Sequence, residues 1–277
     1  PPGGGRQPVT NRMLRHLHCL SFVDMSDATI KGIFGTITEA FLQSTFGDEK
    51  KGLAAPIVAA TVDIFNHACE TLLPTPSKSH YIFNLRDVSK VIQGVLMADK
   101  RRVTEAEQLV NLWGHECTRT FSDRLVSPED RGWFVGQIKA AVKTHFSMDY
   151  RELRPDESVE LLYCDFFTPG YDPSIYEQVT SQEKLAGLMQ EHLLEYNEQH
   201  IPMNLVLFGD AMAHVCRICR VLRQPGGNSL LLGVGGSGRQ SLARLATHIA
   251  DFQIFQARTP RTPHPRTRTP RTPAHPG

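Results

Sequence analysis

Five consecutive segments with helical apolar spacing lie between residues 26 and 147, and they limit this part of the chain to a helical bundle. Each carries apolar residues three and four positions apart, and the first two end at glycine or proline. The helices are expected at 26–46, 53–73, 85–98, 104–125 and 127–146. The inward face of the first is expected to hold Ile30, Ile33, Phe34, Ile37 and Phe41.

Start signals support these helices. Ser26 or Asp27 stands where a side chain can cap the first helix, and Ser127-Pro128 opens the fifth with proline at a position that needs no N–H. The sequences TEAE at 104–107 and TSQE at 180–183 have the capping-box pattern, a hydroxyl residue followed three positions later by glutamate. Two further helices are therefore expected at 180–199 and 208–222.

Residues 148–179 break the helical pattern. Pro155, Pro169, Gly170 and Pro173 punctuate a sequence rich in aromatic residues. Such punctuation is typical of a segment between structural units. The sequence therefore predicts a linker between the bundle and a second unit.

A glycine-rich segment follows an apolar run near the end of the chain. The run SLLL at 229–232 predicts a short strand, GVGGSG at 233–238 a loop, and the apolar spacing over 239–249 a helix. This arrangement binds phosphates, because glycines let backbone N–H groups surround an anion at the positive end of the helix. The alternative is a glycine-rich turn that binds no ligand.

The loop matches the P-loop template G-x-x-x-x-G-K-[ST] in its glycines but not in its last two positions. Arg239 stands in the lysine position and Gln240 in the hydroxyl position, with Ser241 one residue later. Lysine is a compact charge, whereas arginine is a larger planar fork. Gln240 also lacks the hydroxyl that would hold Mg²⁺, so we expect ATP or ADP to bind without a well-formed Mg²⁺ site. The candidate nucleotide-binding residues are Gly233, Gly235, Gly236, Ser237, Gly238, Arg239, Gln240 and Ser241.

The charge of the chain is divided unevenly. Residues 257–277 hold five arginines, six prolines and no acidic residue, so they cannot bury a core and are expected to be disordered. The formal net charge is +1, but without those five arginines 25 basic residues face 29 acidic ones. This balance argues against a nucleic-acid binder for the body of the chain. The tail is either a basic arm for acidic partners, such as nucleic acid or tubulin, or a non-native terminus.

Metal and membrane sites are not expected. Cys216 and Cys219 have the spacing of half a zinc site, but they fall on an apolar helical pattern and are interpreted as buried cysteines. His16, His18 and Cys19 lie in an apolar-alternating stretch, which favours local structure over a metal. No uninterrupted apolar stretch reaches the roughly 18 residues of a transmembrane helix. Six cysteines in 277 residues are too few for a disulfide scaffold, which favours a reducing compartment.

The sequence RQPGGNSLLLGVGGSGRQSLARLATHIADFQIFQ at 223–256 resembles the start of the fourth AAA+ module of axonemal dynein heavy chains. The resemblance extends back through LLYCDFFTPGYDPSIYEQV and HYIFNLRDVSKVIQGVL to PPGGGRQPVTNRMLRHLHCLSF. It implies a fragment whose fold is mainly α with a minor α/β part, a helical lid subdomain followed by the start of a P-loop large subdomain. The implied divisions are 1–25 as the end of the third module's large subdomain, 26–150 as its lid, 151–179 as the linker, 180–256 as the start of the next module, and 257–277 as a disordered tail.

The resemblance also assigns roles to three arginines. Arg86, in the NLRD motif, matches the sensor 2 arginine that reaches the γ-phosphate of its own module. The alternative is a lid arginine paired with Asp87 or with a nearby acid. Arg15 and Arg12 lie where such modules place an arginine finger, which stabilises charge on a neighbouring γ-phosphate. Either is equally interpretable as a surface arginine. Gln7 replaces the asparagine that is usual near sensor 1, so we expect no sensor role for it.

The function implied is that of an ATP-driven, minus-end-directed microtubule motor of cilia and flagella. This segment would contribute nucleotide sensing and coupling in the AAA+ ring, without efficient ATP hydrolysis of its own. The implied partners of the full-length protein are intermediate and light dynein chains and microtubules. The implied location is the cytoplasm, the cytoskeleton and the ciliary axoneme. The alternative is a non-catalytic helical interaction module with a vestigial phosphate loop.

Overall fold

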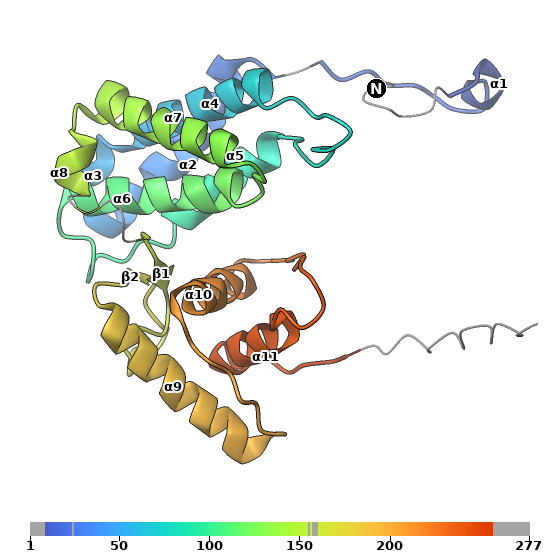
Figure 1. Cartoon of the computed structure of the whole chain (residues 1–277). Helices are drawn as coiled ribbons and strands as arrows, with labels where there is room; N and C mark the ends of the chain where they lie inside the picture. The colour runs from blue at the N-terminus through green and yellow to red at the C-terminus, as the bar shows by residue number, and fades with distance from the viewer. Residues whose placement is uncertain (1–8, 24, 155, 157–159, 257–277) are drawn as a thin grey trace, which may run out of the picture.

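The computed structural model describes residues 9–23, 25–154, 156 and 160–256. Within these ranges two groups of helices flank a small two-stranded sheet, and an exposed N-terminal arm extends away from them (Figure 1). The fold class predicted from the sequence, mainly α with a minor sheet, is confirmed. Gln7 and the segment 257–277 lie outside the described residues.

The first group forms a bundle, and the second group lies below this bundle, with α10 beside the sheet (Figure 1). The bundle consists of α2 (Asp27–Phe46), α3 (Asp48–Lys51), α4 (Ala54–Thr71), α5 (Leu85–Val95), α6 (Ala106–Cys117), the π-helical turn η1 (Thr118–Ser122), α7 (Pro128–Phe146) and α8 (Tyr150–Leu153). The sheet consists of β1 (Tyr163–Cys164) and β2 (Glu177–Gln178), which are antiparallel. The second group consists of α9 (Gln182–Gln199), α10 (Gly209–Arg223) and α11 (Arg239–Ile249), and the arm carries α1 (Asn11–Leu14).

The helix starts follow the capping signals, with two shifts of one residue. The hydroxyls of Ser26 and Ser127 accept hydrogen bonds from the first turns of α2 and α7, as predicted. However, α6 is capped at Glu105, because the Gln108 side chain accepts the backbone N–H of Glu105 at 3.1 Å. Similarly, α9 is capped by Ser181, whose hydroxyl accepts from the backbone N–H three residues later.

The inward face of α2 differs from the predicted stripe. Ile33 and Ile37 are 46% and 45% exposed, whereas Thr38 is fully buried. Thr38 tolerates burial because its hydroxyl donates to the carbonyl of Phe34 at 2.8 Å, which leaves no unsatisfied donor. The helix is therefore rotated relative to the apolar pattern, and it presents two isoleucines to solvent.

The core of the bundle forms around α4 and α6. Trp113 is fully buried, and its indole N–H donates to the Thr61 hydroxyl at 2.9 Å. The stretch Asp48–Thr71 is long and apolar enough to cross a membrane by length and composition alone. Its apolar residues Ile57 and Ile64 are instead buried against the other helices of the bundle, which accounts for that composition.

The segment predicted as a linker is buried in part, at 162–164, 166–167 and 175–177. Along β1, successive side chains belong to different cores: Tyr163 packs into the bundle, while Leu162 and Cys164 pack into the second group. Successive side chains of a strand point to opposite faces, so one short strand serves both cores. The aromatic residues of this segment are the sequence signal of its burial, because aromatic side chains are not favoured in a linker that is exposed to solvent.

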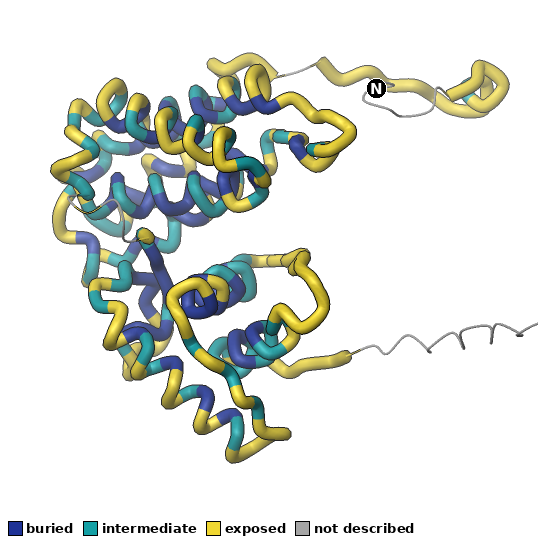
Figure 2. The backbone as a smooth tube through the Cα atoms, viewed as in Figure 1, coloured by how far each residue is buried: buried dark blue, intermediate teal, exposed yellow. Residues whose placement is uncertain are grey.

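The run at 229–232 does not form the predicted strand. Within the described residues β1 and β2 are the strands, and neither pairs with this run. Leu230 and Leu232 are 82% and 80% exposed, and residues 225–237 of the connection from α10 to α11 are all exposed (Figure 2). A strand needs a neighbour for its backbone hydrogen bonds, and no described strand pairs with this run.

Candidate functional site

The glycine-rich loop leads into α11 with the backbone geometry that its sequence requires. Gly236 and Gly238 have φ values of 82° and 76°, a region that side chains disfavour. A Cβ on Gly233 would lie 2.8 Å from the Ser237 hydroxyl oxygen, so the loop also closes tightly on itself. The predicted glycines are thus needed for the shape of the loop.

The first turn of α11 leaves backbone donors open. The N–H of Leu242 donates to the Gly238 carbonyl, but those of Arg239, Gln240 and Ser241 have no acceptor among the described residues. Three open N–H groups at the N-terminus of an 11-residue helix suit an anion such as phosphate. The residues present therefore fit a phosphate group.

Arg239 folds back onto its own loop. Its guanidinium donates to the carbonyls of Leu231 at 3.4 Å and Val234 at 3.2 Å. The side chain therefore lies along the loop and competes with a ligand for this space. Gln240 is exposed at the surface. Neither residue supplies the hydroxyl that holds Mg²⁺ in the P-loop template, so the residues here do not fit that ion well.

The helix α11 is anchored on its inner side. Leu242, Leu245 and Ala246 are buried against α9 and α10. Cys219 and Cys216 are each 1% exposed on α10, and the Cys219 thiol lies 3.6 Å from the Ala246 carbonyl oxygen. The interpretation of both as buried helical cysteines is confirmed.

The three arginines assigned to sensor and finger roles do not meet this loop. Arg86 is exposed in the first turn of α5, and Arg12 and Arg15 lie on the exposed N-terminal arm. Among the described residues no hydrogen bond or ion pair joins any of them to 233–238. Within the described ranges no ion pair joins Arg86 to Asp87 or to another acid, and the Asp87 carboxylate pairs instead with Arg124 at 2.6 Å.

A buried charge network that the sequence pattern did not predict joins the two helical groups. Arg220 of α10 contacts both carboxylate oxygens of Glu116 on α6, with Nε–O distances of 3.1 and 2.9 Å. The hydroxyl of Tyr176 donates to the same carboxylate at 2.9 Å, and His115 Nδ1 lies 3.1 Å from it. The available signal was a charged residue on the inward face of each helix.

The network fixes the charge state of its members. Burial raises the pKa of Glu116, but the positive charge of Arg220 and the hydrogen bonds to the carboxylate outweigh it and lower the pKa to about 2. Burial lowers the pKa of His115 to about 4, against the opposing effect of Glu116. At neutral pH the carboxylate is therefore charged and the imidazole is neutral.

A second set of ion pairs lies at the edge of the same interface. Glu160 accepts from Arg119 of η1 at 2.8 Å and also pairs with Arg217 of α10. Asp123 lies 3.3 Å from Arg119 and 3.9 Å from Arg217. Arg119 of the bundle and Arg217 of α10 thus share two carboxylates. These ion pairs connect the bundle to α10, in addition to the contacts of β1 with both.

Two family models match parts of this chain. Residues 37–131 match the family described as dynein heavy chain, ATPase lid domain, and residues 203–264 match the P-loop containing dynein motor region D4. Dynein axonemal heavy chain 1 of Mus musculus is 44% identical over 268 residues, which is 92% of this chain. The chain belongs to the axonemal dynein heavy chain family.

Other dynein relatives have similar identity. The dynein-1-beta heavy chain of the flagellar inner arm I1 complex of Chlamydomonas reinhardtii is 43% identical over 92% of this chain. Dynein axonemal heavy chain 12 of Homo sapiens is 40% identical over 92% of this chain. The chain spans 6% of the length of heavy chain 1 and of the algal heavy chain, and 9% of heavy chain 12. It therefore corresponds to a small part of each dynein relative.

Proposed function

We propose that this chain is part of an ATP-driven, minus-end-directed microtubule motor of cilia and flagella. Its contribution would be nucleotide sensing and mechanical coupling between neighbouring modules of the AAA+ ring. The observation that carries this proposal is the glycine loop at 233–238, which leaves three backbone N–H groups open at the start of α11 within a region that matches the dynein D4 family. The location would be the axoneme, as part of the cytoskeleton.

Within such a ring, residues 26–150 would serve as the lid of one module and 180–256 as the start of the next, with 151–179 between them. Phosphate would bind at the open N–H groups of α11, surrounded by the loop from Gly233 to Ser241. Arg86, Arg12 and Arg15 would act on nucleotide bound by parts of the protein outside this chain, as sensor 2 and as finger candidates. Their exposure supports this, since a residue that serves a neighbouring site must be accessible.

The charge network between α6 and α10 supports the coupling role. The pair of Glu116 and Arg220 is buried, so a displacement of α10 would either carry α6 with it or separate two desolvated charges. Separation is strongly unfavourable, because each ion would lose its partner without gaining water. We infer that the two helices move together.

Hydrolysis by this chain alone is not expected. Gln240 replaces the hydroxyl that would hold Mg²⁺, and Arg239 occupies the loop where the template has lysine. The full-length protein would supply the remaining modules, and its partners would be intermediate and light dynein chains and microtubules. Adenine nucleotide at this loop would serve regulation rather than turnover.

Titration of the purified chain with a fluorescent ATP analogue tests the nucleotide site. Gly238→Asp should abolish binding, because it places a side chain and a negative charge at a backbone with φ 76° beside the open N–H groups. Gly132→Asp makes the same change on α7, where a Cβ meets nothing within 4 Å, and should leave binding unchanged. Absence of binding at millimolar nucleotide, or equal loss in both variants, would refute the site.

A further inference from the structure

Three of the six cysteines of the chain lie in the core of the second helical group. Cys164 is on β1, and Cys216 and Cys219 are one turn apart on α10. Each residue is 1% exposed, and none of the three forms a disulfide. Among the described residues no group of three ligand side chains is arranged to hold a metal ion, so a shared metal does not account for this cluster.

The thiols of Cys164 and Cys216 contact each other. A hydrogen bond joins the two thiols where α10 packs against β1. The thiol of Cys219 lies instead 3.6 Å from the carbonyl oxygen of Ala246, so it is engaged with α11. Two thiols in contact on adjacent elements can form a disulfide with little movement of the backbone. The structure therefore favours Cys216 over Cys219 as the partner of Cys164.

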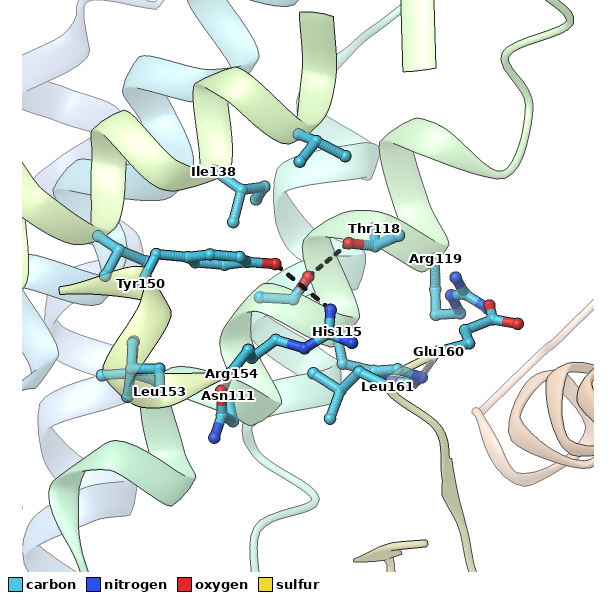
Figure 3. Close-up of a pocket in the computed structure, with 14 residues that line it drawn as sticks. Asn111, His115, Thr118, Arg119, Ile138, Tyr150, Leu153, Arg154, Glu160 and Leu161 are labelled. Atoms are coloured by element: carbon cyan, nitrogen blue, oxygen red, sulfur yellow. Dashed lines mark hydrogen bonds and ion pairs between the residues drawn. The ribbon is translucent and has the colours of Figure 1, made fainter. Parts of the chain in front are cut away.

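Ion pairs before and after Cys164 hold its segment against α10. Asp165, the next residue, pairs with Arg223 at 3.0 Å, and Glu160 pairs with Arg217. Glu160 also contacts an arginine of the bundle, which lies beside it in Figure 3. Because residues on both sides of Cys164 are bound to the same helix, its thiol stays close to that helix. A separation of the two thiols therefore requires that these ion pairs break.

We propose that Cys164 and Cys216 form a redox modification site, which hydrogen peroxide converts to a disulfide between β1 and α10. One sulfur, as its thiolate, attacks a peroxide oxygen. The O–O bond breaks, which leaves a sulfenic acid on that cysteine and releases water. The second sulfur then attacks the sulfenic sulfur, so that the S–S bond forms, the S–O bond breaks and a second water leaves with the remaining thiol proton. The two thiols lose two electrons, and peroxide is reduced to water.

Burial restricts when the two thiols react. The hydrogen bond to Cys216 and burial raise the pKa of the Cys164 thiol well above its ordinary value. The reactive thiolate is therefore scarce while the interface is closed. Peroxide reacts during a local opening of α10 from β1, and reclosure brings the second thiol onto the sulfenic acid. The pair thus reacts after the interface has opened and then holds it closed. In a reducing compartment thiol exchange breaks the bond again.

Treatment of the full chain with hydrogen peroxide, followed by alkylation, trypsin digestion and mass spectrometry of the monomeric fraction, tests this proposal. Cleavage after Arg217 places Cys216 and Cys219 on different peptides, so the partner of Cys164 is identified without a variant. We expect a peptide linked through Cys164 and Cys216, which dithiothreitol separates. A link from Cys164 to Cys219, or recovery of Cys164 and Cys216 on unlinked peptides after overnight treatment, would overturn the proposal.

Variants separate this disulfide from general oxidation. Cys216→Ala should remove the linked peptide, whereas Cys219→Ala, the matched change one turn away on the same helix, should leave it. Arg223→Ala breaks the ion pair with Asp165, so the interface should open more often and the rate of linkage should rise about fivefold. An unchanged rate in Arg223→Ala would refute the control of this site by the opening of α10. If Cys216→Ala does not fold, the peptide map of the unchanged chain decides alone.

Discussion

The guanidinium of Arg220 lies against the carboxylate of Glu116, although the two residues are 104 positions apart in the chain. Their side chains are 8% and 0% exposed, so both charges have left water. Tyr176, the residue before β2, adds a hydrogen bond. The pair thus joins the bundle, the sheet and α10 at a single buried point.

Removal of one partner of this pair should destabilise the chain strongly. Glu116→Leu or Arg220→Leu alone leaves a buried charge without a partner, and we expect a loss of about 3–5 kcal/mol in the free energy of unfolding. The double variant should recover much of this loss, because no unpaired charge remains. Urea unfolding of the unchanged chain, the two single variants and the double variant measures the coupling free energy between the two residues. Single losses below about 1 kcal/mol would mean that the pair is solvated.

Gly94 of α5 provides a steric test of the same carboxylate. A Cβ at this position would lie 1.9 Å from a Glu116 carboxylate oxygen and 2.2 Å from its carboxyl carbon. Gly94→Ala must displace Glu116, so we expect a loss of at least about 2 kcal/mol. The matched change Gly132→Ala on α7 meets nothing within 4 Å and should stabilise the helix by about 0.5–1 kcal/mol. Thermal denaturation compares the two variants, and similar melting temperatures would contradict the packing.

Acid should weaken the fold in two steps. Between pH 6.5 and about 4, the unfolded chain binds a proton at His115 that the folded chain excludes, because burial lowers this pKa to about 4. From about pH 4.5 down to 2, the unfolded chain protonates Glu116 while the folded chain keeps it charged beside Arg220. Both differences lower the free energy of unfolding as the pH falls. Urea unfolding from pH 7 to 3 measures this free energy. In His115→Phe the loss of stability between pH 6.5 and about 4 should be absent.

Arg239→Lys should improve nucleotide binding. The arginine donates to the carbonyls of Leu231 and Val234, whereas lysine is a compact charge that can turn toward phosphate. We expect an affinity for ATP about tenfold higher, measured by the fluorescent titration. The change Arg244→Lys, on the same helix beyond the first turn, is the control. A weaker affinity in Arg239→Lys would mean that the guanidinium itself contacts the nucleotide.

The isolated chain should self-associate through its unpaired extended run. Leu230 and Leu232 are more than three-quarters exposed, at 82% and 80%, and the run has no strand beside it among the described residues. Exposed apolar backbone of this kind pairs readily with another copy. Leu232→Lys should reduce association in analytical ultracentrifugation. Leu73→Lys removes an exposed leucine of the bundle, 60% exposed, and should have little effect. An equal reduction of self-association in both variants would mean that association is not specific to the run at 229–232.

The helices could be predicted because their signals are local. Ser127-Pro128 marks the start of α7, and the cap and first turn of that helix need no distant partner. The glycines of the loop were also predictable, since positive φ at Gly236 and Gly238 is a property of the residue itself. Local signals of this kind are sufficient to predict the helical bundle and the glycine-rich loop.

Features that depend on distant contacts could not be predicted in this way. The burial of Thr38 in place of Ile37 depends on how α2 is rotated against α4, which its own pattern does not specify. The strand predicted at 229–232 needs a neighbour, and local sequence cannot reveal whether one exists. Glu116 and Arg220 find each other only in three dimensions. The apolar pattern around each of these two residues indicates that it lies on an inward face, but it does not identify its partner.

The alternation along β1 has a consequence for where the chain can be divided. Leu162 and Cys164 serve one core while Tyr163, between them, serves the other. The border between the two hydrophobic cores thus runs lengthwise through a strand instead of crossing the chain at a point. Any truncation placed between 150 and 180 would strip a wall from one core or the other, and heating should melt both groups in a single transition.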